Sequence, residues 1–155
     1  MKDMIEVNVI VDEKYEETFV NIYTKKETEQ IDNIVYSIEN ASRNKYPPIP
    51  AYDEENLKFI SQRDIYRIKT EGRKVMVETK NVVYTAKGTM ARFEEELDSE
   101  RFFRISQSEI VNLYKVDSFD FSLNGTVGVV FDNGVRSFVA RRCIKSLRDK
   151  LKSGI

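Results

Sequence analysis

The sequence contains no histidine and only one cysteine, Cys143. Without histidine, the chain lacks the commonest general base of enzymes and the commonest side-chain ligand of metal ions. A single cysteine cannot close a disulfide within the chain, so the fold does not depend on an oxidising compartment. A glycine-rich phosphate loop is also missing. These absences predict a protein that is not an enzyme, uses no metal or cofactor and takes no small-molecule substrate.

Long apolar segments are missing as well. No stretch of 18 consecutive apolar residues occurs, so the sequence predicts no membrane span. The first residues, Met1–Glu6, include acidic side chains and lack the apolar run of a signal peptide. We therefore expect a cytoplasmic protein. The length of 155 residues suggests one compact domain, or one domain with a short appendage.

Charge is unevenly distributed along the chain, although the net charge is only −1. Residues 1–56 contain 6 Lys and Arg against 13 Asp and Glu, a net charge of −7. Residues 57–155 contain 19 against 13, a net charge of +6. Such an asymmetry indicates separate roles for the two segments, with a polyanion as the partner of the basic one. The alternative at this point is that both segments simply carry solvated surface charge.

The acidic segment has the pattern of two strands followed by a helix. Residues 5–11 alternate between apolar and polar side chains, as in a half-buried strand, and Thr18–Tyr23 is predicted to pair with it as a hairpin. A helix over residues 27–41 is expected next, starting at a Thr24–Glu27 capping box or at Thr28. The apolar helix residues expected to pack on the hairpin are Ile31, Ile34, Val35 and Ile38. Residues 1–42 are therefore predicted to be an acidic ββα unit.

Three prolines, Pro47, Pro48 and Pro50, lie in a polar stretch where the sign of the charge changes. Because proline interrupts helices and central strands, residues 43–56 are predicted to be a linker. Residues 57–152 then show mostly strand signals, including a meander with turns at Asn124-Gly125 and Asp132-Asn133-Gly134. Two short helices are expected, over residues 89–97 and 142–152. The predicted fold class is therefore mainly β with short helices (α+β).

Five motifs in this basic segment resemble, in their order, the LytTR family of bacterial DNA-binding domains. They are Asp64-Ile-Tyr-Arg-Ile68, Thr70-Glu-Gly-Arg-Lys-Val75, Arg92-Phe-Glu-Glu-Glu-Leu97, Arg101-Phe-Phe-Arg-Ile-Ser-Gln-Ser108 with Ile110-Val-Asn112, and Val139-Ala-Arg-Arg142 with Ile144-Lys-Ser-Leu147. The chain departs from the family at Ser106 and Gln107, where members often have His or Asn, and at Ala140, which is often Ser. These departures concern the base contacts rather than the fold.

The resemblance implies an elongated β-β-β domain that inserts loops, rather than a recognition helix, into the grooves of DNA. It also implies a sequence-specific transcription regulator that binds direct repeats in double-stranded DNA, commonly as a homodimer. Only 56 residues precede the domain, too few for a receiver domain of the usual size. Control by a co-encoded membrane protein is expected in its place. The acidic unit is expected to mediate self-association or to bind that membrane protein.

Three groups of residues are candidate DNA contacts. In the first, Arg73 and Lys74 follow Gly72, where a backbone without a side chain can approach a phosphate. In the second, Gln107 can pair with both edge groups of adenine, as in direct base readout, whereas Arg104 is either a DNA contact or the partner of a carboxylate. In the third, Arg141 is the strongest single candidate for a DNA contact, because the planar fork of arginine suits both phosphate and guanine. The complete set is Arg73, Lys74, Arg104, Ser106, Gln107, Ser108, Arg141, Arg142 and Lys145.

Each candidate also has an ordinary structural role: a solubilising turn, a loop whose serines hydrogen-bond their own backbone, and an exposed cationic helix face. Three other functions stay open from the residues. The basic half could bind an acidic protein partner, which competition with unrelated DNA would reveal. A carboxylate-dependent enzyme is disfavoured by the missing histidine. RNA binding is disfavoured because no aromatic pattern suited to stacking single-stranded bases is present.

Overall fold

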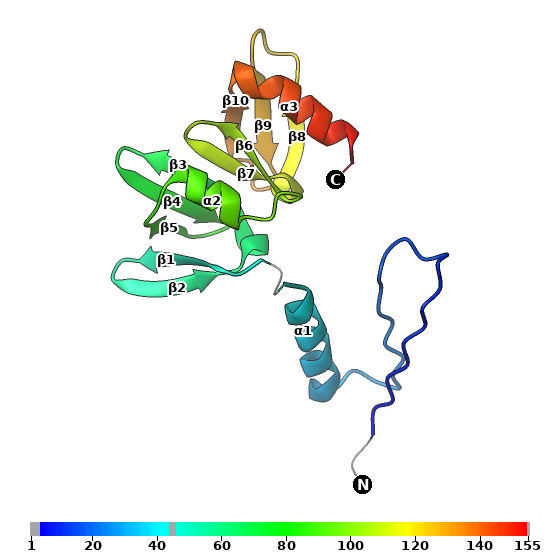
Figure 1. The fold of residues 1–155 in the computed structure, drawn as a ribbon. Coiled ribbons are helices and arrows are strands. Elements are labelled where there is room, and N and C mark those ends of the chain that lie inside the picture. Colours follow the sequence, from blue (N-terminus) through cyan, green and yellow to red (C-terminus); the bar gives the residue numbers. More distant parts are fainter. Residues whose placement is uncertain (1–3, 44–45, 155) are drawn as a thin grey trace. The chain divides into compact units, whose positions relative to one another are not determined.

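The computed structural model describes residues 4–43 and 46–154. The chain divides into two compact units, residues 1–39 and residues 40–155, and each is described by itself. In the second unit, a seven-stranded sheet has the strand order β2-β1-β5-β4-β3-β7-β6, and a three-stranded sheet has the order β10-β9-β8 (Figure 1). This mainly β architecture with short helices confirms the predicted fold class.

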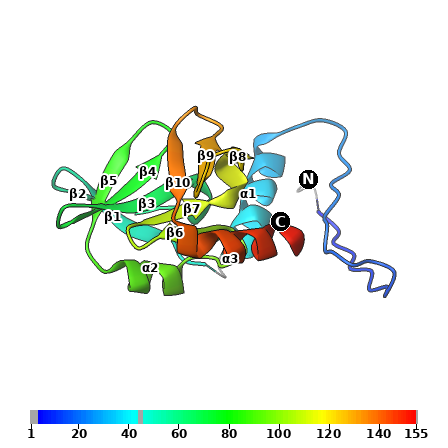
Figure 2. The ribbon, with the colours of Figure 1, turned by 90° about the horizontal axis from the view of Figure 1, so that it is seen from above.

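The strands of the larger sheet are Ile49–Asp53 (β1), Asn56–Ile60 (β2), Ile65–Glu71 (β3), Lys74–Thr79 (β4), Val83–Ala86 (β5), Phe102–Ser106 (β6) and Glu109–Asn112 (β7). Those of the smaller sheet are Val116–Asp120 (β8), Val127–Phe131 (β9) and Arg136–Val139 (β10). The helices of this unit are Met90–Glu96 (α2) and Arg141–Lys152 (α3), which lie on the same side of the strands (Figure 2). Short 3-10 turns, Gln62–Asp64 and Leu113–Lys115, precede β3 and β8.

Alternation along the strands divides the apolar residues between two cores. On β7, for example, Ile110 lies in the core with α2 and the larger sheet, whereas Val111 lies in the core with the smaller sheet and α3. On β3, Ile65 belongs to the first core and Tyr66, the next residue, to the second. Successive side chains of a strand point to opposite faces, so one sheet serves both cores. Strands β3, β6 and β7 therefore hold the two halves of the domain together.

Polar contacts also join the two sheets. Arg67 of β3 pairs with Glu78 of β4 and, at 3.0 Å, with Glu109 of β7. The other carboxylate oxygen of Glu109 accepts a 2.6 Å hydrogen bond from Ser137 of β10. Burial by itself would lower the pKa of Arg67, but hydrogen bonds to Glu78 and Glu109 outweigh it and raise that pKa. This nearly buried network fixes β7 of the larger sheet against β10 of the smaller one.

The β1 strand corrects the predicted linker over residues 43–56. Ile49 and Ala51 are fully buried in the first core, although Pro50 between them is exposed. β1 lies between β2 and β5 and pairs with both. The prediction was wrong for residues 49–53 because a proline whose side chain points outward is compatible with a strand when its missing N–H is not needed for pairing.

In the first unit, the predicted hairpin is absent from the described residues. Within residues 4–28 no strand forms, and the chain runs out and back as an extended loop around a turn at Asp12–Tyr15 (Figure 1). The apolar residues of the predicted hairpin are exposed, with Val9 at 84% and Val11 at 92%. The prediction of strands here was wrong. Two isolated strands are marginal in water, and nothing within this unit covers their apolar face.

Helix α1, Glu29–Arg43, starts two residues later than expected. The hydroxyl oxygen of Thr28 accepts a hydrogen bond from the Ile31 amide, so the alternative start at Thr28 is confirmed and the Thr24–Glu27 capping box is not formed. Val35 and Ile38 are exposed by 39% and 37%, because no hairpin is present for them to pack on. Among the described residues, no helix is both long and apolar enough to cross a membrane.

Candidate nucleic-acid interface

Strand pairing gathers several loops at one end of the larger sheet. Lys74 pairs with Glu71 next to the β3–β4 turn. The neighbouring pairs, Val75 with Ala86 and Lys69 with Glu109, place the end of β5 and the start of β7 at the same end of the sheet. As a result, residues 72–73, 87–88 and 107–108 all leave the sheet on that side, where the β1–β2 turn also lies (Figure 1). We call this the turn end of the sheet. It collects turns from four places in the sequence, at residues 54–55, 72–73, 87–88 and 107–108.

The first predicted group lies at this end. Arg73 and Lys74 are exposed, and Gly72 has a φ of +63°. That backbone conformation is left-handed and favours glycine. A side chain added at Gly72 would meet no other atom within 4 Å. Glycine is therefore required here by the turn rather than by a neighbouring group. The turn presents two cations to solvent without a bulky residue between them.

The second predicted group is a loop whose shape is held by Arg104. The guanidinium donates hydrogen bonds to the carbonyl oxygens of Ser106, at 3.1 Å, and Gln107, at 2.8 Å, and pairs with Glu94 of α2 at 2.8 Å. Arg104 thus has the carboxylate partner that was one of its two predicted roles. Gln107 is exposed at the tip of the loop, and Arg104 fixes its backbone. The side chain of Arg104 is itself 29% exposed.

The serines of this loop have local partners. The Ser106 hydroxyl lies 3.3 Å from the Ser108 hydroxyl and accepts a hydrogen bond from the Ser108 amide. The Ser108 carbonyl accepts from the Thr70 amide at 2.8 Å, which ties this loop to the end of β3. Ser106 and Ser108 therefore have the ordinary structural role, in which serines hydrogen-bond within their own loop. Gln107 is exposed, and its side-chain amide makes no hydrogen bond to another described residue.

The third predicted group forms the start of α3. The Ala140 amide donates to the Ile105 carbonyl at 2.8 Å, and this bond places the first turn of α3 beside the Ser106–Gln107 loop. Arg141 is exposed, and its Nε donates to the Gly125 carbonyl at 2.9 Å. A side chain at Gly125 would collide with that guanidinium at 2.3 Å. Lys145 is exposed one helical turn beyond Arg141, on the same face.

Part of the second group and one residue of the third, Arg142, line the same groove, whereas Arg141 and Lys145 are not in its lining. A groove of about 610 Å³ lies between α2, β6 and α3, and its lining includes Ser106, Gln107 and Arg142. Arg73 and Lys74 line a separate hollow at the turn end, together with Lys87. Sequence reasoning did not identify Lys87, although the Lys87-Gly88 pair repeats the cation-and-glycine signal of the β3–β4 turn. It also did not identify Glu94 as the partner of Arg104.

The candidate site consists of loops and the start of one helix, which carry cations and amide groups at the edge of a β domain. These features define a class of nucleic-acid-binding module that does not present a recognition helix. Comparisons with known proteins specify the class. The family model described as LytTr DNA-binding domain matches residues 55–152. A solved LytTr DNA-binding domain from Bacillus cereus has the same fold, with a TM-score of 0.65 and 20% identity over 70% of this chain and 98% of that one.

The chain therefore belongs to the LytTR family of DNA-binding domains. Two relatives are described as uncharacterized HTH-type transcriptional regulators of Staphylococcus aureus, from strains MSSA476 and MW2. Each is 22% identical over 148 residues, which cover 96% of this chain and 99% of the relative. A helix-turn-helix consists of two helices joined by a turn of a few residues. In the described part of this chain, α2 and α3 are separated by five strands, so their order does not form that motif.

Proposed function

We propose that this chain is a sequence-specific transcription regulator that acts by binding double-stranded DNA, without a catalytic step, in the bacterial cytoplasm. Gln107 and Arg141 are proposed to contact bases. Arg73, Lys74, Arg142 and Lys145 are proposed to contact phosphates, with Ser106 and Ser108 at the margin of the contact and Arg104 supporting it. The observation that carries this proposal is the exposed Gln107 on a loop braced by Arg104, next to the first turn of α3.

The chemistry of these two side chains supports base contact. Glutamine can donate to and accept from the major-groove edge of adenine, and arginine can donate two parallel hydrogen bonds to guanine. Arg141 retains donors for such a pair because only its Nε is engaged by the Gly125 carbonyl. A side chain that is already oriented loses less conformational entropy on binding. Both residues are therefore suited to reading sequence.

Selection of bound duplexes from a random DNA pool tests the proposal and supplies a binding sequence. Against that sequence, Gln107→Ala and Arg141→Ala should each weaken binding by about 1–3 kcal/mol, the cost of one good base contact. Gln30→Ala replaces an exposed glutamine of α1 and serves as the matched control. If both variants bind like the wild type, neither residue reads DNA.

We further propose that the protein binds direct repeats as a homodimer. The exposed apolar side chains of residues 5–11 and of α1 support a role for the first unit in self-association, since such side chains are stabilised when a partner covers them. A co-encoded membrane protein is the alternative occupant of this surface. The relatives match nearly the full chain, so the first unit has a counterpart in them.

Sizing measurements on a shortened chain test the dimer proposal. The shortened chain should start at Tyr46, ahead of β1, because β1 is part of the sheet. We expect the full chain to elute as a dimer and residues 46–155 to elute as a monomer. Equal oligomeric states would exclude the first unit as the dimer interface. A full-length monomer that gains mass only with a membrane partner would favour the alternative.

A further inference from the structure

The hollow at the turn end contains a cation that the three predicted groups do not include. Its volume is about 620 Å³, and its lining includes Arg73, Lys74 and Lys87. All three side chains are exposed. Among the residues that the structure describes, none of the three takes part in an ion pair. Three cations outnumber the two glutamates in the lining of this hollow, and the excess positive charge attracts a polyanion.

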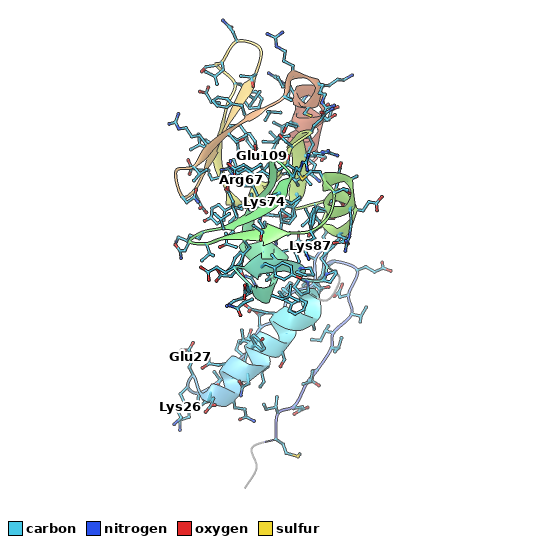
Figure 3. The ribbon with its side chains drawn as sticks, turned by 90° about the vertical axis from the view of Figure 1, so that its left-hand side faces the viewer. Lys26, Glu27, Arg67, Lys74, Lys87 and Glu109 are labelled. Atoms are coloured by element: carbon cyan, nitrogen blue, oxygen red, sulfur yellow. The ribbon has the colours of Figure 1, made fainter. Side chains whose placement is uncertain are left out.

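Lys87 is held in place rather than left to sample solvent freely. Its Nζ lies 5.3 Å from the centre of the Tyr52 ring, within the range of a cation–π contact. Tyr52 itself is half-buried on β1. Gly88 follows with a φ of +139°, a backbone conformation that residues with a side chain rarely adopt. In Figure 3, Lys74 and Lys87 both lie on the side of the domain that faces the viewer.

Acidic residues limit the hollow on one side. Glu54 and Glu55, in the β1–β2 turn, contribute to the same lining as the three cations. No ion pair within the described residues connects either of them to Arg73, Lys74 or Lys87. A negatively charged backbone would be repelled by this turn and attracted by the opposite wall. The arrangement therefore favours a polyanion that passes along the cations and ends at the glutamates.

From these observations we propose that Lys87 is a DNA-phosphate contact that extends the Arg73–Lys74 surface, with the Glu54–Glu55 turn as the boundary of the bound backbone. The inference rests on the proposed DNA-binding function. The DNA backbone fits better than a small anion because the cations are exposed along a surface and do not converge on a buried polar group. Tyr52 is assigned the part of a positioning residue because its ring contacts Lys87.

A phosphate contact has a different signature from a base contact. Lysine presents a compact charge without the planar geometry that distinguishes bases, so its loss should weaken binding to every sequence alike. Removal of one phosphate contact should also reduce the slope of log affinity against log salt by about 0.9. These two signatures separate Lys87 from Gln107 and Arg141, whose loss should act on the selected sequence.

The test uses the full chain and an unrelated duplex of about 30 base pairs, with affinity measured between 50 and 200 mM salt. Lys87→Ala should weaken binding about three- to tenfold at the lowest salt and lower the salt slope by about 0.9. Lys87→Arg should restore both values. Lys152→Ala, at the other end of α3, is the matched control because it removes an exposed lysine far along the helix from the groove.

Two further variants sharpen the test. Glu55→Gln should strengthen binding to the same duplex about two- to threefold at 50 mM salt, because it removes a repulsive charge at the boundary. Tyr52→Leu, which keeps an apolar side chain on β1, should weaken binding less than Lys87→Ala does. Unchanged affinity and slope for Lys87→Ala, with Gln107→Ala still defective on the selected sequence, would overturn this inference alone. A wild type that binds no duplex would overturn the proposed function instead.

Discussion

At the scale of single residues, the side chains proposed to read DNA differ from the side chains that hold the loops in place. Arg104 belongs to the second kind, because all three of its hydrogen-bonding partners lie in the protein. The sequence motif marked Arg104 as important but could not distinguish between its two roles, since a cation beside a polar loop suits both. The distinction depends on Glu94, which lies ten residues earlier and reaches Arg104 only in the folded domain.

Replacing Arg104 by lysine separates these roles. Lysine keeps the positive charge but lacks the planar fork that donates to both loop carbonyls and to Glu94. We expect Arg104→Lys to weaken binding to the selected sequence about tenfold while the salt slope stays as in the wild type. Titrations at several salt concentrations measure both quantities. If affinity is retained and only Arg104→Ala is defective, Arg104 is itself a phosphate contact.

Tyr66 gives a second prediction at this scale. Its hydroxyl donates a hydrogen bond to Asp132, in the turn after β9, and so links the two sheets. This bond, together with burial and the charge of Asp132, raises the pKa of Tyr66 to about 12. Tyr66→Phe should lower the free energy of unfolding by about 1.5–3 kcal/mol at neutral pH, the value of a hydrogen bond to a charged group.

The pH dependence of Tyr66→Phe has a definite sign. A tyrosine whose pKa is raised on folding stabilises the folded state fully below its ordinary pKa, and this stabilisation is lost as the pH rises toward the folded value. The stability difference between wild type and Tyr66→Phe should therefore be constant up to about pH 9 and shrink between pH 10 and 12. Denaturant melts across this range measure it, and a difference that grows would contradict the assignment.

At the scale of elements, the regular pattern of the basic segment predicted most of its strands, whereas β6 and β7 were matched only as part of a family motif. The meander, the β3–β4 hairpin and both short helices lie where alternation, glycine turns and helical spacing placed them. Two elements were not predictable for physical reasons. β1 contains Pro50, and the local sequence does not show that this proline lies at an exposed position of the sheet. The alternation of residues 5–11 is a strand signal, but a strand also needs a partner, and the pattern does not supply one.

The buried side of β1 can be tested by a pair of substitutions in adjacent residues. Ile49 is 1% exposed, so Ile49→Ala should lower the free energy of unfolding by about 2–5 kcal/mol. Pro50→Ala, at an exposed position of the same strand, should change it by less than about 1 kcal/mol. Chemical denaturation of the full chain measures both. Equal effects of the two substitutions would mean that residues 49–53 are a linker, as the sequence suggested.

At the scale of the whole chain, the positions of the cations and the hydrogen bonds between the two sheets explain how separate loops can contact one DNA duplex. The turn end carries Arg73, Lys74 and Lys87, and the groove carries Gln107 and Arg142, so one DNA duplex could be contacted from the end of one sheet and the start of α3. The Glu109–Ser137 bridge connects the strand that follows the Gln107 loop with the strand that leads to Arg141. The sequence predicted the three groups separately, and the pairing of strands determines which of them share a surface.

The Glu109–Ser137 bridge yields a prediction about specificity. Ser137 is buried, so Ser137→Ala removes a donor without exposing a charge to DNA. We expect a loss of affinity for the selected sequence of about five- to tenfold, with binding to unrelated duplexes unchanged, because only the geometry between the two reading elements is altered. Ser118→Ala, at an exposed position of β8, is the control. Equal losses on both kinds of DNA would argue against a positioning role.

Selection from a random DNA pool with the full chain tests the central claim most directly, namely that loops of this domain read a DNA sequence. The account predicts enrichment of a repeated motif by the wild type. It also predicts that binding weakens by about 10³-fold from 50 to 200 mM salt if about six phosphates are contacted. Gln107→Ala and Arg141→Ala should each lose preference at defined positions of that motif. A pool that stays random after repeated rounds, or a motif that both variants select unchanged, would contradict it.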